Sequence, residues 1–182
     1  MHTEHLFIRP ITLDDAEAYW PLVSLPEVLR YTGEQPQSSL DDVRHILATR
    51  PLRDYEVYGF GRMACIEKSS GRVVGFSGLK YLEDLRDVDI GYRFLPDCWG
   101  KGYATESARA LMDQGAIEHG IVRIVGLVQP GNIASARVLE KIGLIFEREV
   151  KPEDCESALK LYATPGTGPG DSFKPRPLRG SA

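Results

Sequence analysis

The stretch PDCWGKGYATE, residues 96–106, constrains the fold of this chain most strongly, because the hydrophobic period changes within it. Before it, apolar and polar residues alternate from Val88 to Leu95, which predicts a half-buried strand. After it, apolar residues recur at helical spacing from Ala104 to Ala116, which predicts an amphipathic helix. Gly100 and Gly102 turn the chain between the two. Backbone N–H groups at such a turn, together with the positive end of the helix, favour a bound anion.

Two glycines between a strand and a helix also suit a simple tight turn. Two better-known phosphate motifs are excluded here. The Walker pattern needs Ser or Thr directly after Gly-Lys, and the dinucleotide fingerprint needs a third glycine. Lys101 adds a positive charge to the turn. The sequence therefore predicts an anion cradle of a different kind.

The residues that follow indicate a parallel crossover. The long helix should end near His119-Gly120, and residues 121–128 are β-branched and apolar enough to predict a strand. A strand, a helix and a strand in this order predict a right-handed parallel connection. A second short helix is predicted from Ile133 to Ile142, with Asn132 as its N-cap and Gly143 after its end.

The remaining segments predict one α/β domain with a mixed, mostly antiparallel sheet. Further strands are expected at 6–10, 57–67, 72–80, 145–150 and 157–163, and helices from Thr12 to about Leu22 and from Ser39 to about Thr49. The strands at 57–67 and 72–80 should form a hairpin that leads antiparallel into the strand carrying Asp89. We assign residues 1–164 to the domain and residues 165–182 to a Pro- and Gly-rich tail.

The tail cannot bury enough apolar surface to fold alone, and we expect it to be disordered in solution. Docking on a neighbouring subunit through Phe173 and Leu178, as in a homodimer, is the open alternative.

Composition limits the class of protein. The 182 residues are 42% hydrophobic and 26% charged, as in an ordinary globular domain, and the net charge of −4 argues against a nucleic-acid partner. Cys65, Cys98 and Cys155 are odd in number and widely spaced, which predicts reduced thiols and no metal site. No run approaches the ~18 apolar residues of a membrane span, and no leader is visible. We expect a cytoplasmic protein without a membrane partner.

Three motifs, in this order, resemble the GNAT N-acetyltransferases. They are DIGYRF at 89–94, WGKGYATE at 99–106 and NIASARVLEKIGL at 132–144. Within that superfamily they are similar to the branch of the Rim ribosomal-protein N-terminal acetyltransferases. The resemblance covers about residues 5 to 164. It implies a twisted GNAT sheet with helices on both faces, and direct transfer of acetyl from acetyl-CoA to a primary amine.

The resemblance also implies where acetyl-CoA binds. The pyrophosphate would lie on the amides of the glycine turn, and the pantetheine arm along the preceding strand, where parallel strands splay. Asn132 would contact the arm, and Ser135 would lie near the thioester sulfur. The implied cosubstrate-binding residues are Tyr92, Arg93, Phe94, Leu95, Trp99, Gly100, Lys101, Gly102, Tyr103, Ala104, Thr105, Asn132 and Ser135.

Attack of an amine on a thioester needs a proton acceptor for the amine and a proton donor for the thiolate. Asp89 stands where the related enzymes usually have a glutamate, so it is the candidate base. Ser135 is the candidate donor to sulfur. A backbone N–H between Tyr92 and Phe94 is the expected oxyanion donor. Asp97 departs from the usual glutamine or arginine of the cradle motif, and we expect it to face solvent.

The acceptor stays open between a protein N-terminus and a small amine, amino acid, polyamine or antibiotic. Glu34 and Asp87 are candidate amine contacts, although solvated loop charges are the preferred interpretation. An aromatic group lines either the acceptor pocket or the core, the core being the default: Trp20, Tyr31, Tyr55, Tyr58 and Phe60. A catalytically silent acyl-CoA-binding or protein-interaction module is the alternative function, because aspartate replaces glutamate at Asp89. A nucleotide-binding regulator is a third.

Overall fold

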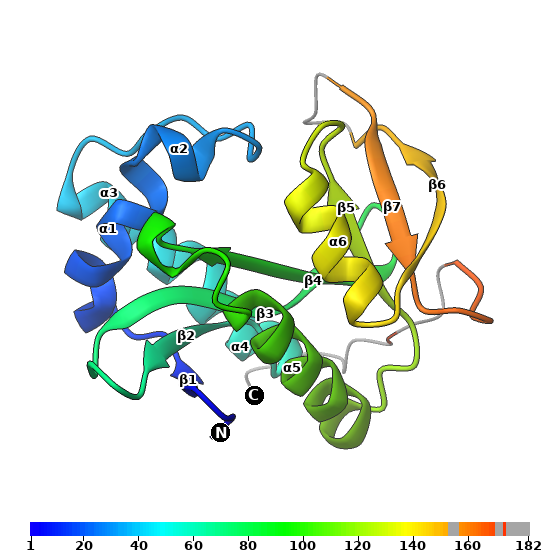
Figure 1. Ribbon diagram of the computed structural model, residues 1–182, viewed down its shortest axis with the longest axis horizontal. Coiled ribbons are helices and arrows are strands. Elements are labelled where there is room, and N and C mark those ends of the chain that lie inside the picture. Colours follow the sequence, from blue (N-terminus) through cyan, green and yellow to red (C-terminus); the bar gives the residue numbers. More distant parts are fainter. Residues whose placement is uncertain (153–156, 170–172, 174–182) are drawn as a thin grey trace, which may run out of the picture.

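The computed structural model describes residues 1–152, 157–169 and 173. Its centre is a seven-stranded sheet in the order β1-β2-β3-β4-β5-β7-β6 (Figure 1). The strands are β1 (Leu6–Pro10), β2 (Arg62–Glu67), β3 (Val73–Leu82), β4 (Asp87–Phe94), β5 (Ile124–Val128), β6 (Ile145–Val150) and β7 (Leu159–Ala163). Every neighbouring pair is antiparallel except β4 and β5, which are parallel. The predicted mixed sheet with one parallel crossover is confirmed.

Helices cover both faces of the sheet. The helices are α1 (Ala16–Ser24), α2 (Pro26–Leu29), α3 (Leu40–Leu47), α4 (Arg53–Tyr58), α5 (Tyr103–His119) and α6 (Ile133–Lys141), with short turns η1 (Leu13–Asp15), η2 (Ala48–Leu52) and η3 (Pro96–Cys98). One core cluster joins the sheet to α5 and α6, and a second joins it to α1 and α3. Gly115 lets α5 approach β3, since a Cβ there would lie 2.4 Å from Leu79 Cδ1.

One predicted strand is wrong at its start. The strand was predicted from residue 57. Residues 53–58 instead form the helix α4, and β2 begins at Arg62. The helix ends at Gly59, whose φ of +80° suits glycine. Tyr55 holds α4 in place, because its hydroxyl accepts from Ile11 N at 3.0 Å and donates to the Arg62 carbonyl. These contacts outweigh the alternating pattern of residues 57–60. β5 and β7 also begin later than predicted, at Ile124 and Leu159.

The described part of the tail contacts its own domain, and disorder of the tail in solution stays a prediction. Arg123 Nη1 donates to the Thr167 carbonyl at 3.1 Å. The ring of Phe173 packs on Tyr58, Phe60 and Tyr81, with centroids 6.5, 5.0 and 5.8 Å away. The rest of the predicted tail, with Leu178, lies outside the described residues, as does Cys155.

The parallel strands β4 and β5 pair over two positions only, Val88 with Ile124 and Asp89 with Val125. Beyond Asp89 they diverge: β4 continues to Phe94, while β5 turns toward β7 and α6 (Figure 1). This divergence is the splay that the family resemblance implies, and it leaves the backbone of β4 from Ile90 onward without a strand partner on that edge. The cradle and the second short helix lie on its two sides.

Candidate active site

The predicted cradle forms at the start of α5. Gly100 and Gly102 have φ of +78° and +85°, and a Cβ at either would meet nothing within 4 Å. Within the described residues, the N–H groups of Gly100, Lys101 and Gly102 donate to no protein acceptor. α5 has no side-chain N-cap, so its first-turn N–H groups, from Tyr103 to Thr105, lack partners as well. Six consecutive N–H groups at the positive end of a 17-residue helix therefore have no acceptor among the described residues.

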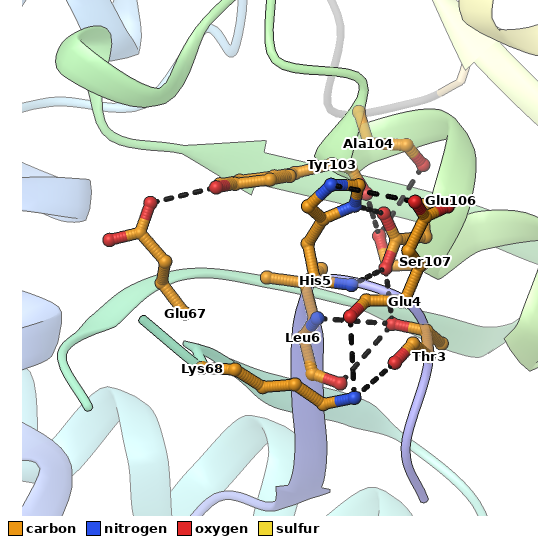
Figure 2. Close-up of polar contacts among 10 residues, drawn as sticks. All are labelled: Thr3, Glu4, His5, Leu6, Glu67, Lys68, Tyr103, Ala104, Glu106 and Ser107. Atoms are coloured by element: carbon orange, nitrogen blue, oxygen red, sulfur yellow. Dashed lines mark hydrogen bonds and ion pairs between the residues drawn. The ribbon is translucent and has the colours of Figure 1, made fainter. Parts of the chain in front are cut away.

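The side chain of Lys101 is directed to Glu67 of β2. Its Nζ lies 3.2 Å from Glu67 Oε1, which also accepts from the Tyr103 hydroxyl at 2.7 Å (Figure 2). Ser70 donates to the other oxygen at 2.7 Å. Hydrogen bonds from Ser70, Tyr103 and Lys101 lower the pKa of Glu67 to about 2. The Lys101 ammonium group is thus paired with Glu67. The backbone amides of the turn are the donors that can bind an anion there.

Asp97 faces solvent as predicted, with 57% of its side chain exposed, and it forms an ion pair with Arg72. The hydrogen bond from Arg72 lowers the pKa of Asp97. Arg72 therefore offsets the negative charge that the sequence places beside the cradle. The neighbouring Cys98 is 2% exposed, and burial raises the pKa of its thiol, which suits an inert cysteine.

The N-terminal segment lies against the first turn of α5 (Figure 2). Glu106, in the first turn of α5, accepts from Thr3 Oγ1 at 2.5 Å and from His5 N at 2.8 Å, and its other oxygen lies 2.8 Å from His5 Nδ1. Gly102 and Thr105 line an open pocket of about 510 Å³ beside these residues. Sequence reasoning missed this contact, because Thr3 and His5 lie about a hundred residues before their partner.

Residues on the two sides of the splay contact each other. Asn132 Oδ1 accepts from Ser135 N at 3.1 Å, so the predicted N-cap of α6 is confirmed. The Tyr92 hydroxyl donates to the Ser135 carbonyl at 2.9 Å and lies 3.2 Å from Ser135 Oγ. Burial raises the pKa of Tyr92. The family resemblance places Tyr92 along the pantetheine arm, and its hydroxyl in addition contacts Ser135.

Asp89 lies on the face of β4 that is turned away from α5, and it is 8% exposed. Its Oδ2 accepts from Arg62 Nη2 at 2.5 Å. The Arg62 side chain crosses Gly91 to make this contact: a Cβ on Gly91 would lie 2.4 Å from Nη2. The candidate base therefore has a guanidinium on one oxygen, while Oδ1 accepts no hydrogen bond within the described residues. No local sequence signal links Arg62 to Asp89.

Arg93 continues the same face. Its Nη1 donates to the Leu22 carbonyl at 3.0 Å and its Nη2 to Glu34 at 2.7 Å, while Arg50 lies 2.9 Å from Glu34. Burial opposes ionisation of Glu34, but the two arginines prevail and lower its pKa. Glu34 is thus no solvated loop charge. Asp87 is not one either: it is fully buried and holds Arg123 at 3.1 Å, at the closed end of the splay, which removes it as an amine contact.

The other predicted residues serve several parts of the fold. Phe94 lies in the core, Leu95 packs on the second cluster, and the Trp99 indole donates to the Phe94 carbonyl at 2.8 Å. The five aromatics do not form one group. Tyr58 and Phe60 contact Phe173, Tyr55 holds α4, Trp20 joins the second core cluster, and Tyr31 faces Gly131.

The described residues contain no group of His, Cys, Asp and Glu side chains that could hold a metal ion. None of the helices within the described ranges combines the length and apolar character needed to cross a membrane.

A mixed, mostly antiparallel sheet with one splayed parallel pair and helices on both faces is the fold of the N-acyltransferase class. The acetyltransferase (GNAT) domain model matches residues 5–145, so the chain belongs to the GNAT acetyltransferase family, and acetyl transfer to an amine is its activity. It is 45% identical over 151 residues to the uncharacterized N-acetyltransferase YnaD of Bacillus subtilis (strain 168), covering 78% of this chain and 80% of the relative.

Solved structures of acetyltransferases have the same fold. A GNAT-family acetyltransferase from Bacillus anthracis is 28% identical, with a TM-score of 0.71 over 90% of this chain and 96% of the other. The ribosomal-protein-S5-alanine acetyltransferase from Vibrio fischeri is 18% identical, with a TM-score of 0.69 over 96% and 98%. A member of the Rim branch thus shares the fold, as the resemblance predicted. At this identity the likeness concerns the fold and not the acceptor.

Proposed function

We propose that this enzyme binds acetyl-CoA in the cradle and the splay and transfers its acetyl group directly to a primary amine. The observation that carries the proposal is the run of six N–H groups from Gly100 to Thr105, which have no protein acceptor in the described chain. Amides in this arrangement suit a pyrophosphate. Within the described residues, the edge of β4 beyond Asp89 has no strand partner and the Asn132 amide nitrogen has no acceptor, so both can bind the peptide-like arm.

In the proposed reaction the amine nitrogen forms the bond to the acetyl carbon and the C–S bond breaks. The nitrogen loses a proton and the departing thiolate gains one, so no covalent enzyme intermediate is required. Asp89 is the proposed proton acceptor, through its free Oδ1. A backbone N–H of β4 between Tyr92 and Phe94 is the proposed donor to the oxyanion.

Ser135 and Tyr92 are the proposed proton source for the thiolate. Their hydroxyls lie 3.2 Å apart between β4 and α6, so one can donate while the other replaces the proton. The raised pKa of Tyr92 keeps its hydroxyl protonated at neutral pH, which suits a donor.

Location and assembly stay predictions. Acetyl-CoA as donor and the free buried thiols Cys65 and Cys98 support a cytoplasmic protein. A homodimer would use an exposed surface, and the edge strand β6, with Ile145 and Phe146 56% and 51% exposed, is a suitable candidate.

Gly102→Val tests the cradle. The substitution places a branched side chain in the open space and disfavours φ of +85°, so we expect CoA affinity to fall at least tenfold by titration calorimetry. Gly71→Val is the matched control, because Gly71 has φ of +68° and open space in the β2–β3 turn. Both variants should lose about 1–2 kcal/mol of stability. Thiol release from acetyl-CoA with a panel of amines measures transfer. Wild-type CoA affinity in Gly102→Val would remove the cradle from the site.

A further inference from the structure

Charged side chains gather on the face of the sheet that is turned away from α5. Cross-strand pairing places Lys80 beside Asp89, Gly78 beside Gly91 and Phe76 beside Arg93, so these rows share one face. We call this surface, with the charged groups above it, the acceptor face. Its charged members are Glu34, Arg50, Asp54, Arg62, Lys80, Asp89 and Arg93.

Tyr19 shows that several of these groups are close to one another. The residue is 6% exposed and its ring stacks on Phe76, with centroids 5.3 Å apart. Burial raises its pKa to about 12, and the charges of Arg93, Glu34, Arg62 and Arg50 all act on it. Its hydroxyl makes no hydrogen bond to any described residue, so it is available to a ligand on this face.

The carboxylates near the reacting centre already have cationic partners. Asp89 holds Arg62, and Glu34 holds both Arg93 and Arg50. Asp54 is 9% exposed and burial raises its pKa, which disfavours its charged form.

Lys80 is a cation of this face that forms no ion pair within the described residues, although its charge acts on the carboxyl of Asp54. It is half-buried, and it makes no hydrogen bond or ion pair with any other described residue. Its neighbour in the sheet, Asp89, is bonded to Arg62 instead. Ser77 Oγ is the one side-chain N or O atom of the described residues that is both buried and without a hydrogen-bond partner, so Lys80 Nζ reaches solvent and is accessible to an anion that arrives with a ligand.

Two loops cover the acceptor face and limit the size of what it accepts. The loop after α2 is held to β4 by the ion pair between Glu34 and Arg93. It meets the loop after β5, because a Cβ on Gly33 would lie 3.7 Å from Gln129 Nε2, and one on Gly131 would lie 4.0 Å from Tyr31. A small acceptor suits this enclosure better than a folded protein surface.

We propose that the acceptor is a small amine that carries its own carboxylate, such as an α-amino acid, and that Lys80 binds this carboxylate beside Asp89. The proposal rests on the acetyl transfer proposed above. A polyamine or an aminoglycoside would bring several positive charges to a face where the carboxylates of Asp89 and Glu34 are already paired with arginines.

The test compares α-amino acids with their carboxamides, which differ only at the carboxylate, in a thiol-release assay with acetyl-CoA. Spermidine and kanamycin represent the polycations. We expect kcat/KM at least tenfold higher for an acid than for its amide, and weaker turnover of both polycations. Preference of the wild type for a polycation or an amide would overturn the proposal while leaving acetyl transfer intact.

Variants of Lys80 test whether this residue binds the carboxylate of the acceptor. Lys80→Met should raise KM for the amino acids at least tenfold and leave KM for their carboxamides unchanged. The preference for the acid over the amide should therefore be abolished. Lys80→Gln replaces Lys80→Met if that variant unfolds. Lys160→Met, an exposed lysine on β7, is the matched control and should keep the preference. An unchanged KM for the acids in Lys80→Met would remove Lys80 from the site.

Binding separates this proposal from the function on which it rests. If no amine is acetylated, thermal shifts of the CoA-bound protein report the acceptor, because a ligand of the folded state raises the unfolding temperature. Stabilisation by acids and not by polycations or amides supports the proposal, and the reverse or no difference overturns it. Failure to bind CoA at all would overturn the proposed function and this inference together.

Discussion

The carboxylate of Asp89 is nearly buried, and a single arginine from another strand determines its surroundings. Arg62 reaches it across Gly91, where a Cβ would lie 2.4 Å from the Arg62 Nη2. The motif DIGYRF predicted the strand and the position of Asp89, because alternation and glycine content are local properties. Its partner comes from 27 residues away, and no spacing rule in the sequence connects the two.

Asp89→Asn tests the proposed base. The amide cannot take a proton, so we expect kcat at pH 7 to fall about 10²-fold, with partial recovery at higher pH as free amine becomes abundant. The measurement is the pH profile of kcat/KM. Asp41→Asn, a 91% exposed aspartate on α3, is the matched control and should keep the wild-type profile. Thermal unfolding of Asp89→Asn reports the separate cost of leaving Arg62 without its partner. A profile identical to the wild type would exclude Asp89 as the base.

Ser135→Ala and Tyr92→Phe test the proton source for the thiolate. Each removes one of the two hydroxyls that lie 3.2 Å apart, so each should lower kcat about tenfold or more while the affinity for CoA stays within about twofold. Ser69→Ala in the exposed β2–β3 turn is the control. If Tyr92→Phe alone lowers kcat, Tyr92 is the donor and Ser135 only positions it. Full activity in both variants would remove the pair from the mechanism.

At the scale of elements, the sequence predicted best where one segment determines its own structure. The long helix, its end at Gly120, the Asn132 cap and the parallel crossover all follow from local period and turn residues, whereas the splay was implied by the family resemblance. Residues 57–60 were misassigned because their alternation suits a strand, whereas the tertiary contacts of Tyr55 and the left-handed Gly59 favour a helix end. The ion pairs of Glu34 and Asp87 could not be predicted, since their arginines lie on other elements.

The contact between the N-terminal segment and α5 should depend on pH. The hydrogen bond to Glu106 raises the pKa of His5, and nearby Glu4 adds to this effect while Lys68 opposes it. A raised pKa in the folded state means that the contact is at full strength below about pH 6.5 and is lost as pH rises through the raised value. The backbone N–H of His5 donates to Glu106. Its protection against hydrogen exchange, measured relative to an unfolded peptide, should therefore fall above the raised pKa of the His5 side chain.

Amide hydrogen exchange across pH 5–9 measures this loss. His5→Gln should remove the pH dependence and leave exchange in the middle of α5 unchanged, and His45→Gln, an exposed histidine on α3, should behave as the wild type. Protection of the His5 amide that is the same at every pH would show that Thr3, and not His5, holds the segment.

At the scale of the whole molecule, one buried arginine joins the sheet to the segment after it. Arg123 is 1% exposed and contacts Asp87 of β4 at 3.1 Å, Glu147 of β6 at 3.0 Å and Thr167 at 3.1 Å. It stands directly before β5, where the parallel pair is closed. The paired end of the splay is thus fixed by charges from three parts of the chain, while the other end stays open toward the cradle.

Arg123→Met should therefore lower the free energy of unfolding by about 3–5 kcal/mol, because it keeps the size of the side chain but leaves the buried Asp87 without this guanidinium. Urea denaturation of the full chain measures the change. Arg44→Met removes an exposed pair with Asp41 and should cost no more than about 0.5 kcal/mol. CoA affinity of Arg123→Met, measured where the variant is still folded, should fall as well if the closed end sets the angle of the splay. A loss of stability as small as that of Arg44→Met would mean that apolar packing around β5, and not this network, holds the two strands together.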